Sequence, residues 1–294
     1  MPFTIAHISD VHLSPIDGFT PRHWSLKRAL GYANWLRQRR ASYDRAVLDR
    51  IVADIVAAAP DHIAVTGDLV NLALETEFPL ARKWLESVGP PERVTAIPGN
   101  HDVYVRATRD RFAQSWAGYL RDEQAGGHVT FPSLRRRGPL ALIGLSSAVP
   151  TPPLMATGTL GRTQLAALER VLKTLAAEQT FRVLLVHHPL RSDSRIKRLT
   201  DSAELIALIR LHGVELVLHG HDHIHSTIWL EGPNGAIPVV GVPSASALAH
   251  GRYPAAAYNL YSIEHDNAVW RCEQIVRGID AKLGLREIGR VRLF

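Results

Sequence analysis

The sequence predicts an α/β protein. Short apolar runs of strand length alternate with longer segments in which apolar residues recur at the helical period. This alternation is typical of βαβ units, and strands that are apolar throughout are typical of a mostly parallel sheet covered on both faces. With 294 residues, 46% of them hydrophobic, the chain is long enough to form a large core. No linker divides it, so we expect a single domain spanning residues 1–294.

The expected elements follow one another in a regular order. Strands are predicted at residues 3–9, 61–67, 93–99, 181–186 and 214–219. Helices are predicted at residues 45–58, 78–87, 106–123, 162–177 and 202–212. Residues 237–279 resemble strands with a hairpin turn at Asp266-Asn267, residues 150–161 a loop near the site, and Arg135-Arg136-Arg137 a solvated loop. Each of the first set of strands ends in Asp, Asn or His, at the edge where α/β sheets bind ligands.

Composition narrows the class of protein. The formal charge of +6 and the pI of about 9.7 favour anionic partners, although an arginine-rich codon usage explains the same balance. Cys272 is the single cysteine, so neither a disulfide framework nor a thiolate metal site is expected. The N-terminus does not resemble a signal peptide, and no apolar run reaches the length of a membrane-spanning helix. We therefore expect a cytoplasmic protein.

The polar residues at the strand ends indicate a metal site. Asp10 and His12 lie two residues apart and can share an ion, and Asp68, Asn100 and His187 follow three later strands. With two histidines from residues 216–225, they make seven oxygen and nitrogen ligands. That is too many for one tetrahedral zinc and suits two ions that share a carboxylate. Two ions roughly 3.5–4 Å apart are used for in-line displacement at phosphorus.

Spacing alone does not identify the histidine ligands in the stretch LVLHGHDHIH. His219, His221, His223 and His225 occupy alternate positions and would all face the same side of an ideal strand. Residue-level reasoning therefore leaves the choice between them open.

Five sequence blocks resemble the signature of the calcineurin-like metallophosphoesterases. The blocks are D-x-H (10–12), G-D-L-V-N (67–71), G-N-H-D (99–102), H-H-P (187–189) and G-H-D-H (220–223), and they occur in the order of that family. Within the family, the chain is most similar to the bacterial branch of class III cyclic nucleotide phosphodiesterases and metal-dependent glycerophosphodiesterases. The resemblance implies a four-layer αββα sandwich, in which two packed β-sheets are flanked by helices, instead of a single parallel sheet.

The resemblance also implies a ligand set for two metal ions, which would be manganese, iron or zinc. Asp68 would bridge them, and their shared water, as hydroxide, would attack phosphorus in line. The other implied ligands are Asp10, His12 and His223 on the first metal and Asn100, His187 and His221 on the second. His219 would then pack at the strand end, and His225 would lie behind the ligands or be exposed.

Four further residues of the blocks receive roles by the same resemblance. His101 would stabilise the transition state or protonate the leaving group, and Asp102 is suited to orient it. Asn71 and His188 are candidate substrate-binding residues. A loop-ordering role is the alternative for Asn71, and a structural role is the alternative for His188.

Residues 19–40 insert an arm between the first ligand pair and the first long helix. As a helix, the arm would carry an apolar stripe, with Trp24 and Trp35 on a neighbouring face, among several arginines, Lys27 and His23. The stripe comprises Leu26, Ala29, Leu30, Ala33 and Leu36. We expect the stripe to pack beside the active site or to form a homodimer contact. The alternative is contact with a membrane surface at the inner membrane face.

These observations predict a phosphodiester hydrolase that acts on a small anionic phosphoester. In the family that the chain resembles, members that favour monoesters place arginines beside the metals, whereas the nearest candidates by sequence, Arg106 and Arg191, do not match that pattern. The alternative is a pyrophosphohydrolase of a lipid precursor such as UDP-diacylglucosamine. A phosphomonoesterase or a non-catalytic scaffold is less favoured, because every ligand position is filled. Nucleic acid is not an expected partner, because no basic stripe is interleaved with aromatic residues.

Overall fold

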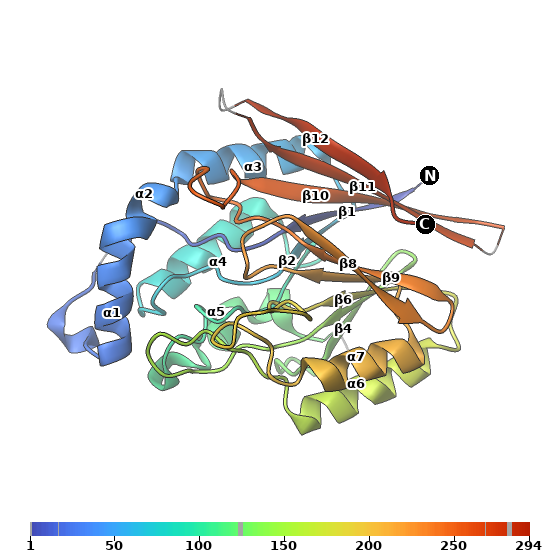
Figure 1. Cartoon of the computed structure of the whole chain (residues 1–294), viewed down its shortest axis with the longest axis horizontal. Helices are drawn as coiled ribbons and strands as arrows, with labels where there is room; N and C mark the ends of the chain where they lie inside the picture. Colours follow the sequence, from blue (N-terminus) through green and yellow to red (C-terminus); the bar gives the residue numbers. More distant parts are fainter. Residues whose placement is uncertain (1, 17, 123–125, 268, 281–283) are drawn as a thin grey trace.

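Two β-sheets form the centre of the molecule (Figure 1). The computed structural model of the protein describes residues 2–16, 18–122, 126–267, 269–280 and 284–294. One sheet contains β1 (Phe3–Ile8), β2 (His62–Val65), β3 (Val94–Ala96), β10 (Ala257–Asp266), β11 (Val269–Ile279) and β12 (Leu285–Arg292). The other contains β4 (Ser133–Arg137), β5 (Leu140–Gly144), β6 (Phe181–Leu185), β7 (Leu216–His219), β8 (Ser226–Gly232) and β9 (Gly235–Gly241).

Both sheets are mixed, so the expectation of one mostly parallel sheet is only half right. The first sheet has the order β12-β11-β10-β1-β2-β3, and the second has the order β4-β5-β6-β7-β9-β8. The parallel pairs are β1–β2, β2–β3, β5–β6, β6–β7 and β7–β9. The remaining pairs are antiparallel: β10 pairs with β1 from far along the chain, and hairpins extend each sheet to its edges. The predicted hairpin turn lies between β10 and β11, where Asn267 has a positive φ of 49°.

Side-chain alternation along the strands produces the four layers. Ile5 of β1 faces the core between the sheets, whereas Ala6 and Ile8 face the helices α3 (Arg45–Ala58), α4 (Glu77–Val88) and α5 (Arg111–Leu120). On the other side, Leu184 of β6 faces α6 (Arg162–Leu175) and α7 (Ser202–His212). The αββα sandwich that the family resemblance implied is confirmed.

The basic run at residues 135–137 belongs to β4 and is not a solvated loop. Arg135 is buried, and its Nη1 atom donates hydrogen bonds to the carbonyl oxygens of Val94 and Tyr119, at 2.9 and 3.1 Å. The next residue, Arg136, points outward and pairs with Glu178 at 2.6 Å. Three consecutive arginines interrupt the apolar run expected of a buried strand, so the sequence pattern did not indicate β4. The helix expected over 106–123 is a 3₁₀ turn, η3 (Arg106–Thr108), followed by α5.

The arm packs by a different face from the one expected. It forms η1 (Pro21–His23), α1 (Leu26–Asn34), a π-helical turn η2 (Trp35–Arg39) and α2 (Arg40–Ser42), and Figure 1 shows α1 at the left edge of the view, apart from the sheets. Trp35 is buried with Leu72, and Arg28 is buried and donates to the carbonyl oxygens of Leu72 and Ala73. The leucines of the expected packing stripe, Leu26, Leu30 and Leu36, are exposed. None of the helices in the described parts of the chain is long and apolar enough to cross a bilayer.

Candidate dinuclear metal centre

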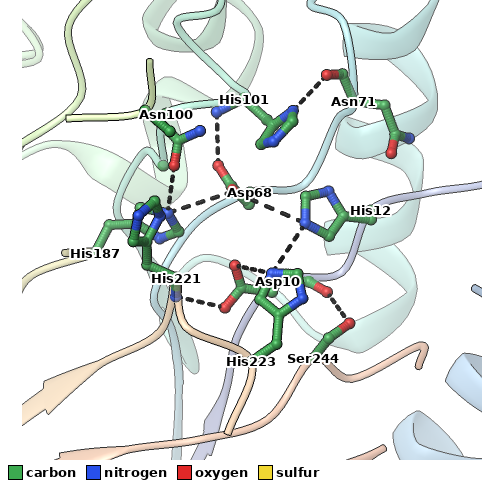
Figure 2. A network of polar contacts seen from close by, with 12 residues as sticks. Asp10, His12, Asp68, Asn71, Asn100, His101, His187, His221, His223 and Ser244 are labelled. Carbon is green, nitrogen blue, oxygen red and sulfur yellow. Dashed lines mark hydrogen bonds and ion pairs between the residues drawn. The ribbon is translucent and has the colours of Figure 1, made fainter. Parts of the chain in front are cut away.

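The predicted ligands meet at one edge of the paired sheets, where five strands end. Asp10 and His12 follow β1, Asp68 follows β2 and Asn100 follows β3, in the first sheet. His187 follows β6, and His221 and His223 follow β7, in the second sheet. Figure 2 shows all seven side chains directed at one another. The site therefore requires both sheets, and the packing between them sets its geometry.

Three of these side chains form one half of the site. The Nε2 atom of His223 lies 3.0 Å from Oδ1 of Asp10 and 3.4 Å from Nε2 of His12. In the other half, Nε2 of His187 lies 3.1 Å from Oδ1 of Asn100, and His221 groups with His187 and Asp68. These halves match the division into two metal sites that the family resemblance implied.

Asp68 lies between the two halves (Figure 2). Its Oδ2 atom is 3.3 Å from Nε2 of His187 on one side and 3.8 Å from Nε2 of His12 on the other. Its Oδ1 atom accepts a hydrogen bond of 2.7 Å from the backbone N–H of His101. The carboxylate is buried and held in place to serve both halves.

The backbone is strained at most of the ligand positions. φ is positive at Asp10 (52°), His12 (43°), Asp68 (56°), His221 (71°) and His223 (56°). Residues other than glycine adopt this left-handed conformation at a cost, and it concentrates at functional sites. Asp10 and His12 therefore face the same site through tight turns, and not through the strand alternation that the sequence argument assumed.

Two motif glycines permit the close approach of the loops. A Cβ atom on Gly99 would lie 2.2 Å from Oδ1 of Asp68, and one on Gly220 would lie 2.3 Å from Oδ2 of Asp10. Any side chain at these positions would displace a ligand carboxylate. Glycine precedes the ligands in the G-N-H-D and G-H-D-H blocks because the carboxylates need that space.

The histidine rings are oriented as metal ligands usually are. His187 donates from Nδ1 to the carbonyl oxygen of Thr66 at 2.7 Å, and Nδ1 of His12 lies 3.3 Å from the carbonyl oxygen of Val70. The Nε2 atoms are thus left to face the centre. Nε2 of His221 is buried and has no hydrogen-bond partner among the described residues. An orphaned buried nitrogen is costly unless a ligand satisfies it.

Electrostatics of the centre favour bound cations. Burial alone lowers the pKa of His187, but the carboxylates of Asp68 and Asp10 outweigh it and raise the pKa to about 10. The field that draws a proton onto this ring would also stabilise a metal ion. Burial lowers the pKa of His221 well below its ordinary value, which keeps the imidazole neutral and able to coordinate. The residues present therefore fit two metal ions.

His101 occupies the expected position, but its orienting partner is not Asp102. Nδ1 of His101 donates to the carbonyl oxygen of Asn71 at 2.5 Å. Asp102 is buried, and its two oxygens accept hydrogen bonds from four backbone N–H groups at 2.8–3.1 Å. These donors belong to Asp68, Leu69, Val70 and Gly99. Asp102 thus ties the Asp68 loop to the Asn100 loop and positions His101 only through the backbone.

The other predicted residues of the site differ in their contacts and burial. Asn71 donates from Nδ2 to the carbonyl oxygen of Leu13 at 2.8 Å, which fits its loop-ordering role, and its substrate contact stays a prediction. His188 is buried, with Ser147 Oγ 2.7 Å from Nδ1 and the Ala156 carbonyl 3.1 Å from Nε2, so its ring is not free for substrate. His219 is buried at the strand end, whereas His225 is exposed.

Sequence reasoning missed Arg39. Its Nη1 atom lies 2.9 Å from Nε2 of His101, and it lines the cavity of about 280 Å³ that contains Asp68, Asn100 and His221. Arg106 and Arg191 are the arginines that follow signature blocks in the sequence. Arg39 lies in the arm, where nothing in the sequence distinguishes it from Arg37 or Arg40.

Comparison with solved structures finds proteins of the same fold at low sequence identity. A dimetal phosphatase from Danio rerio aligns with a TM-score of 0.64 at 14% identity, over 99% of this chain and 98% of that one. A purple acid phosphatase from yellow lupin (Lupinus luteus) seeds aligns with a TM-score of 0.62 at 11% identity, over 98% of this chain and 53% of that one. The anchor protein of the inner membrane complex of Plasmodium aligns with a TM-score of 0.55 at 11% identity, over 99% of this chain and 88% of that one. At these identities the likeness concerns the fold alone.

Sequence comparison supplies the family. No curated protein matches the chain significantly. The family model described as calcineurin-like phosphoesterase matches residues 3–225, a span that contains every predicted metal ligand. The chain therefore belongs to the calcineurin-like phosphoesterase family.

Proposed function

We propose that this protein is a dinuclear metal-dependent phosphodiester hydrolase. The observation that carries the proposal is the position of Asp68, whose Oδ2 atom lies 3.3 Å from His187 Nε2 and 3.8 Å from His12 Nε2. A carboxylate shared by two groups of nitrogen and oxygen donors is suited to hold two cations a short distance apart. Bound there, the cations would neutralise charge on the phosphoryl group and supply an activated water.

The protein groups would position the phosphoester and hold protons. Nδ1 of His101 donates to the Asn71 carbonyl, so Nε2 is the ring atom that faces the site, where it accepts a hydrogen bond from Arg39. Nε2 can hold a proton for the leaving oxygen once Arg39 turns from it to the substrate. The His187 and His12 rings are oriented by carbonyl oxygens of neighbouring loops, which limits reorganisation during the reaction.

The preference for diesters rests on charge and on the sequence blocks. A monoester dianion needs positive groups around its additional oxygen, whereas a monoanionic diester needs fewer. Arg39 is a cation beside the site, so the absence of an arginine next to the signature blocks does not by itself favour diesters. Its Nη1 atom nevertheless points at His101 Nε2. Arg39 thus lies beside His101, the group proposed to assist the leaving oxygen. The G-D-L-V-N block also resembles the phosphodiesterase branch.

Steady-state kinetics test the proposal. Values of kcat/KM on bis-p-nitrophenyl phosphate and on p-nitrophenyl phosphate should be compared with the same metal and at the same pH. We expect the diester to be hydrolysed more efficiently. A tenfold preference for the monoester would assign the protein to the phosphomonoesterases instead.

A further inference from the structure

The metal cavity continues past His101 into a second cavity beneath the arm. The second cavity has a volume of about 260 Å³ and shares part of its lining with the metal cavity. The shared residues are Asn34, Arg39, Asn100, His101 and Ala156. His101 therefore stands at the boundary, so a substrate whose phosphorus lies over the metal centre can extend one substituent into the second cavity.

The arm places two cations in this second cavity. Arg39 donates from Nη1 to Nε2 of His101, at 2.9 Å. Lys27 donates from Nζ to Thr151 Oγ1 at 2.7 Å, and its Nζ atom lies 4.4 Å from the centre of the Tyr104 ring. Within the described ranges of the chain, neither Arg39 nor Lys27 forms an ion pair with a carboxylate. Both are thus available to a negatively charged ligand.

The neighbouring Arg28 has a structural role in the arm, in contrast to Arg39 and Lys27. Its guanidinium is buried and donates to the carbonyl oxygens of Leu72 and Ala73, which ties the arm to the body of the molecule. Lys27 has no comparable set of acceptors, and burial lowers its pKa to about 8. Holding a cation in a cavity without a counter-charge is unfavourable, so the arrangement is stabilised once an anion enters.

We propose that the second cavity binds the leaving group, and that Arg39 and Lys27 select a leaving group that carries its own negative charge. The inference rests on the proposed function and specifies its substrate class. In the reaction, the water oxygen forms a bond to phosphorus and the bond to the leaving oxygen breaks. The water gives up one proton and the leaving oxygen gains one. The volume is below the roughly 300–1,000 Å³ of typical ligand sites, so it suits a phosphate or a single ring.

Two substrates that differ in the charge of the leaving group test this selection. Methyl 4-nitrophenyl phosphate and methyl 3-carboxy-4-nitrophenyl phosphate differ by one carboxylate on leaving groups of similar acidity. We expect metal-loaded wild-type protein to favour the carboxylate substrate by roughly tenfold or more, the size of a hydrogen bond to a charged group. Uridine diphosphate glucose, in which the leaving group is a phosphate ester, tests phosphate as the source of the charge.

Variants assign the selection to the two cations. Arg39→Met and Lys27→Met should each reduce the kcat/KM ratio of charged to neutral substrate toward one, whatever happens to the absolute rates. Arg37→Met is the matched control, because Arg37 lies on the same π-helical turn and is exposed, and it should keep the wild-type ratio. Arg39→Lys should restore part of the ratio, which separates loss of charge from loss of folding.

The results distinguish failure of the subsite proposal from failure of the phosphodiesterase proposal. A ratio of one in the wild type, or a wild-type ratio in both Arg39→Met and Lys27→Met, would overturn the subsite and leave the phosphodiesterase proposal intact. Hydrolysis of p-nitrophenyl phosphate with no hydrolysis of either diester would overturn both. A larger loss of kcat/KM on uridine diphosphate glucose than on methyl 4-nitrophenyl phosphate in Arg39→Met, with metal content unchanged, would support phosphate as the bound anion.

Discussion

Four histidines that are equivalent by spacing have different environments at the end of β7. His219 is the last residue of the strand, and its Nδ1 lies 3.1 Å from the carbonyl oxygen of Gly220. After Gly220 the chain turns, and the positive φ values of His221 and His223 direct both rings into the centre. His225 lies beyond the turn and is exposed. The break at a glycine, and not the two-residue period, decides which rings can hold metal.

Single substitutions in this cluster should separate ligands from neighbours. His221→Ala and His223→Ala should each lower the affinity for one metal by more than the roughly 10–100-fold that loss of a supporting partner costs. His219→Ala and His225→Ala are the controls and should retain wild-type metal content, measured by elemental analysis after dialysis. If His219→Ala loses metal while His223→Ala does not, the assignment across residues 219–223 is wrong.

At the scale of residues, the sequence predicts which side chains gather but not what each one contacts. The motif blocks are local, so they identify residues such as Asp68 and Asn100. The partner of Asp102 depends on how the Asp68 and Asn100 loops meet, and its two oxygens bind backbone N–H groups of both. Arg39 reaches His101 from 62 residues away, and no local pattern reports such a contact.

At the scale of elements, α3 is held against the first sheet by a polar cluster as well as by its apolar face. Asp54 of α3 accepts hydrogen bonds from Arg277 of β11, at 2.6 and 2.7 Å, and from the Tyr258 hydroxyl of β10. Burial opposes ionisation, but the hydrogen bonds from Arg277 and Tyr258 hold the pKa of Asp54 below its ordinary value. The cluster therefore stabilises the fold above the ordinary carboxyl pKa, and this contribution is lost as the pH falls through the lowered pKa.

Loss of this cluster should be measurable by urea denaturation at neutral pH. Asp54→Ala should lower the free energy of unfolding by about 1–2 kcal/mol, because the partly exposed Arg277 and the buried Tyr258 both lose their partner. Asp49→Ala is the control on the same helix. Its pair with Arg45 is exposed on both sides, at 51% and 57%, and should contribute less than about 0.5 kcal/mol. Equal losses in the two variants would show that the cluster is no stronger than a surface pair.

The accuracy of the element predictions follows the strength of the apolar period only in part, since β5 is apolar and buried throughout and was not predicted. Helices α3 and α7 have the predicted bounds, because each buries a regular apolar stripe. Strand β4 was missed because Arg135 fills a buried position through hydrogen bonds to carbonyl oxygens. Strand β12 was missed for a related reason, since an edge strand that is largely exposed carries little apolar signal.

At the scale of the whole molecule, the arm presents an exposed apolar surface beside the two cavities. Trp24, Leu26, Leu30 and Leu36 are 68%, 67%, 41% and 46% exposed. Leu30 also lines the second cavity, so this surface extends to that cavity. The exposed arginines Arg22 and Arg40 lie in the same arm. We propose that this surface contacts an anionic lipid membrane, because apolar side chains among basic ones match the boundary between acyl chains and anionic headgroups.

Vesicle co-sedimentation tests the membrane contact. The protein should co-sediment with vesicles that contain phosphatidylglycerol, less so with pure phosphatidylcholine, and added salt should release it, since each basic residue near an anionic surface contributes about 1 kcal/mol. Leu26→Ser and the charge reversal of Arg22 and Arg40 to Glu should each weaken binding without affecting hydrolysis of bis-p-nitrophenyl phosphate. Leu211→Ser is the matched control, because Leu211 is also 67% exposed and belongs to α7, a helix that lies away from the arm (Figure 1). Wild-type protein that ignores anionic vesicles at low salt would contradict the proposal, and self-association that Leu26→Ser abolishes would identify the surface as a homodimer contact.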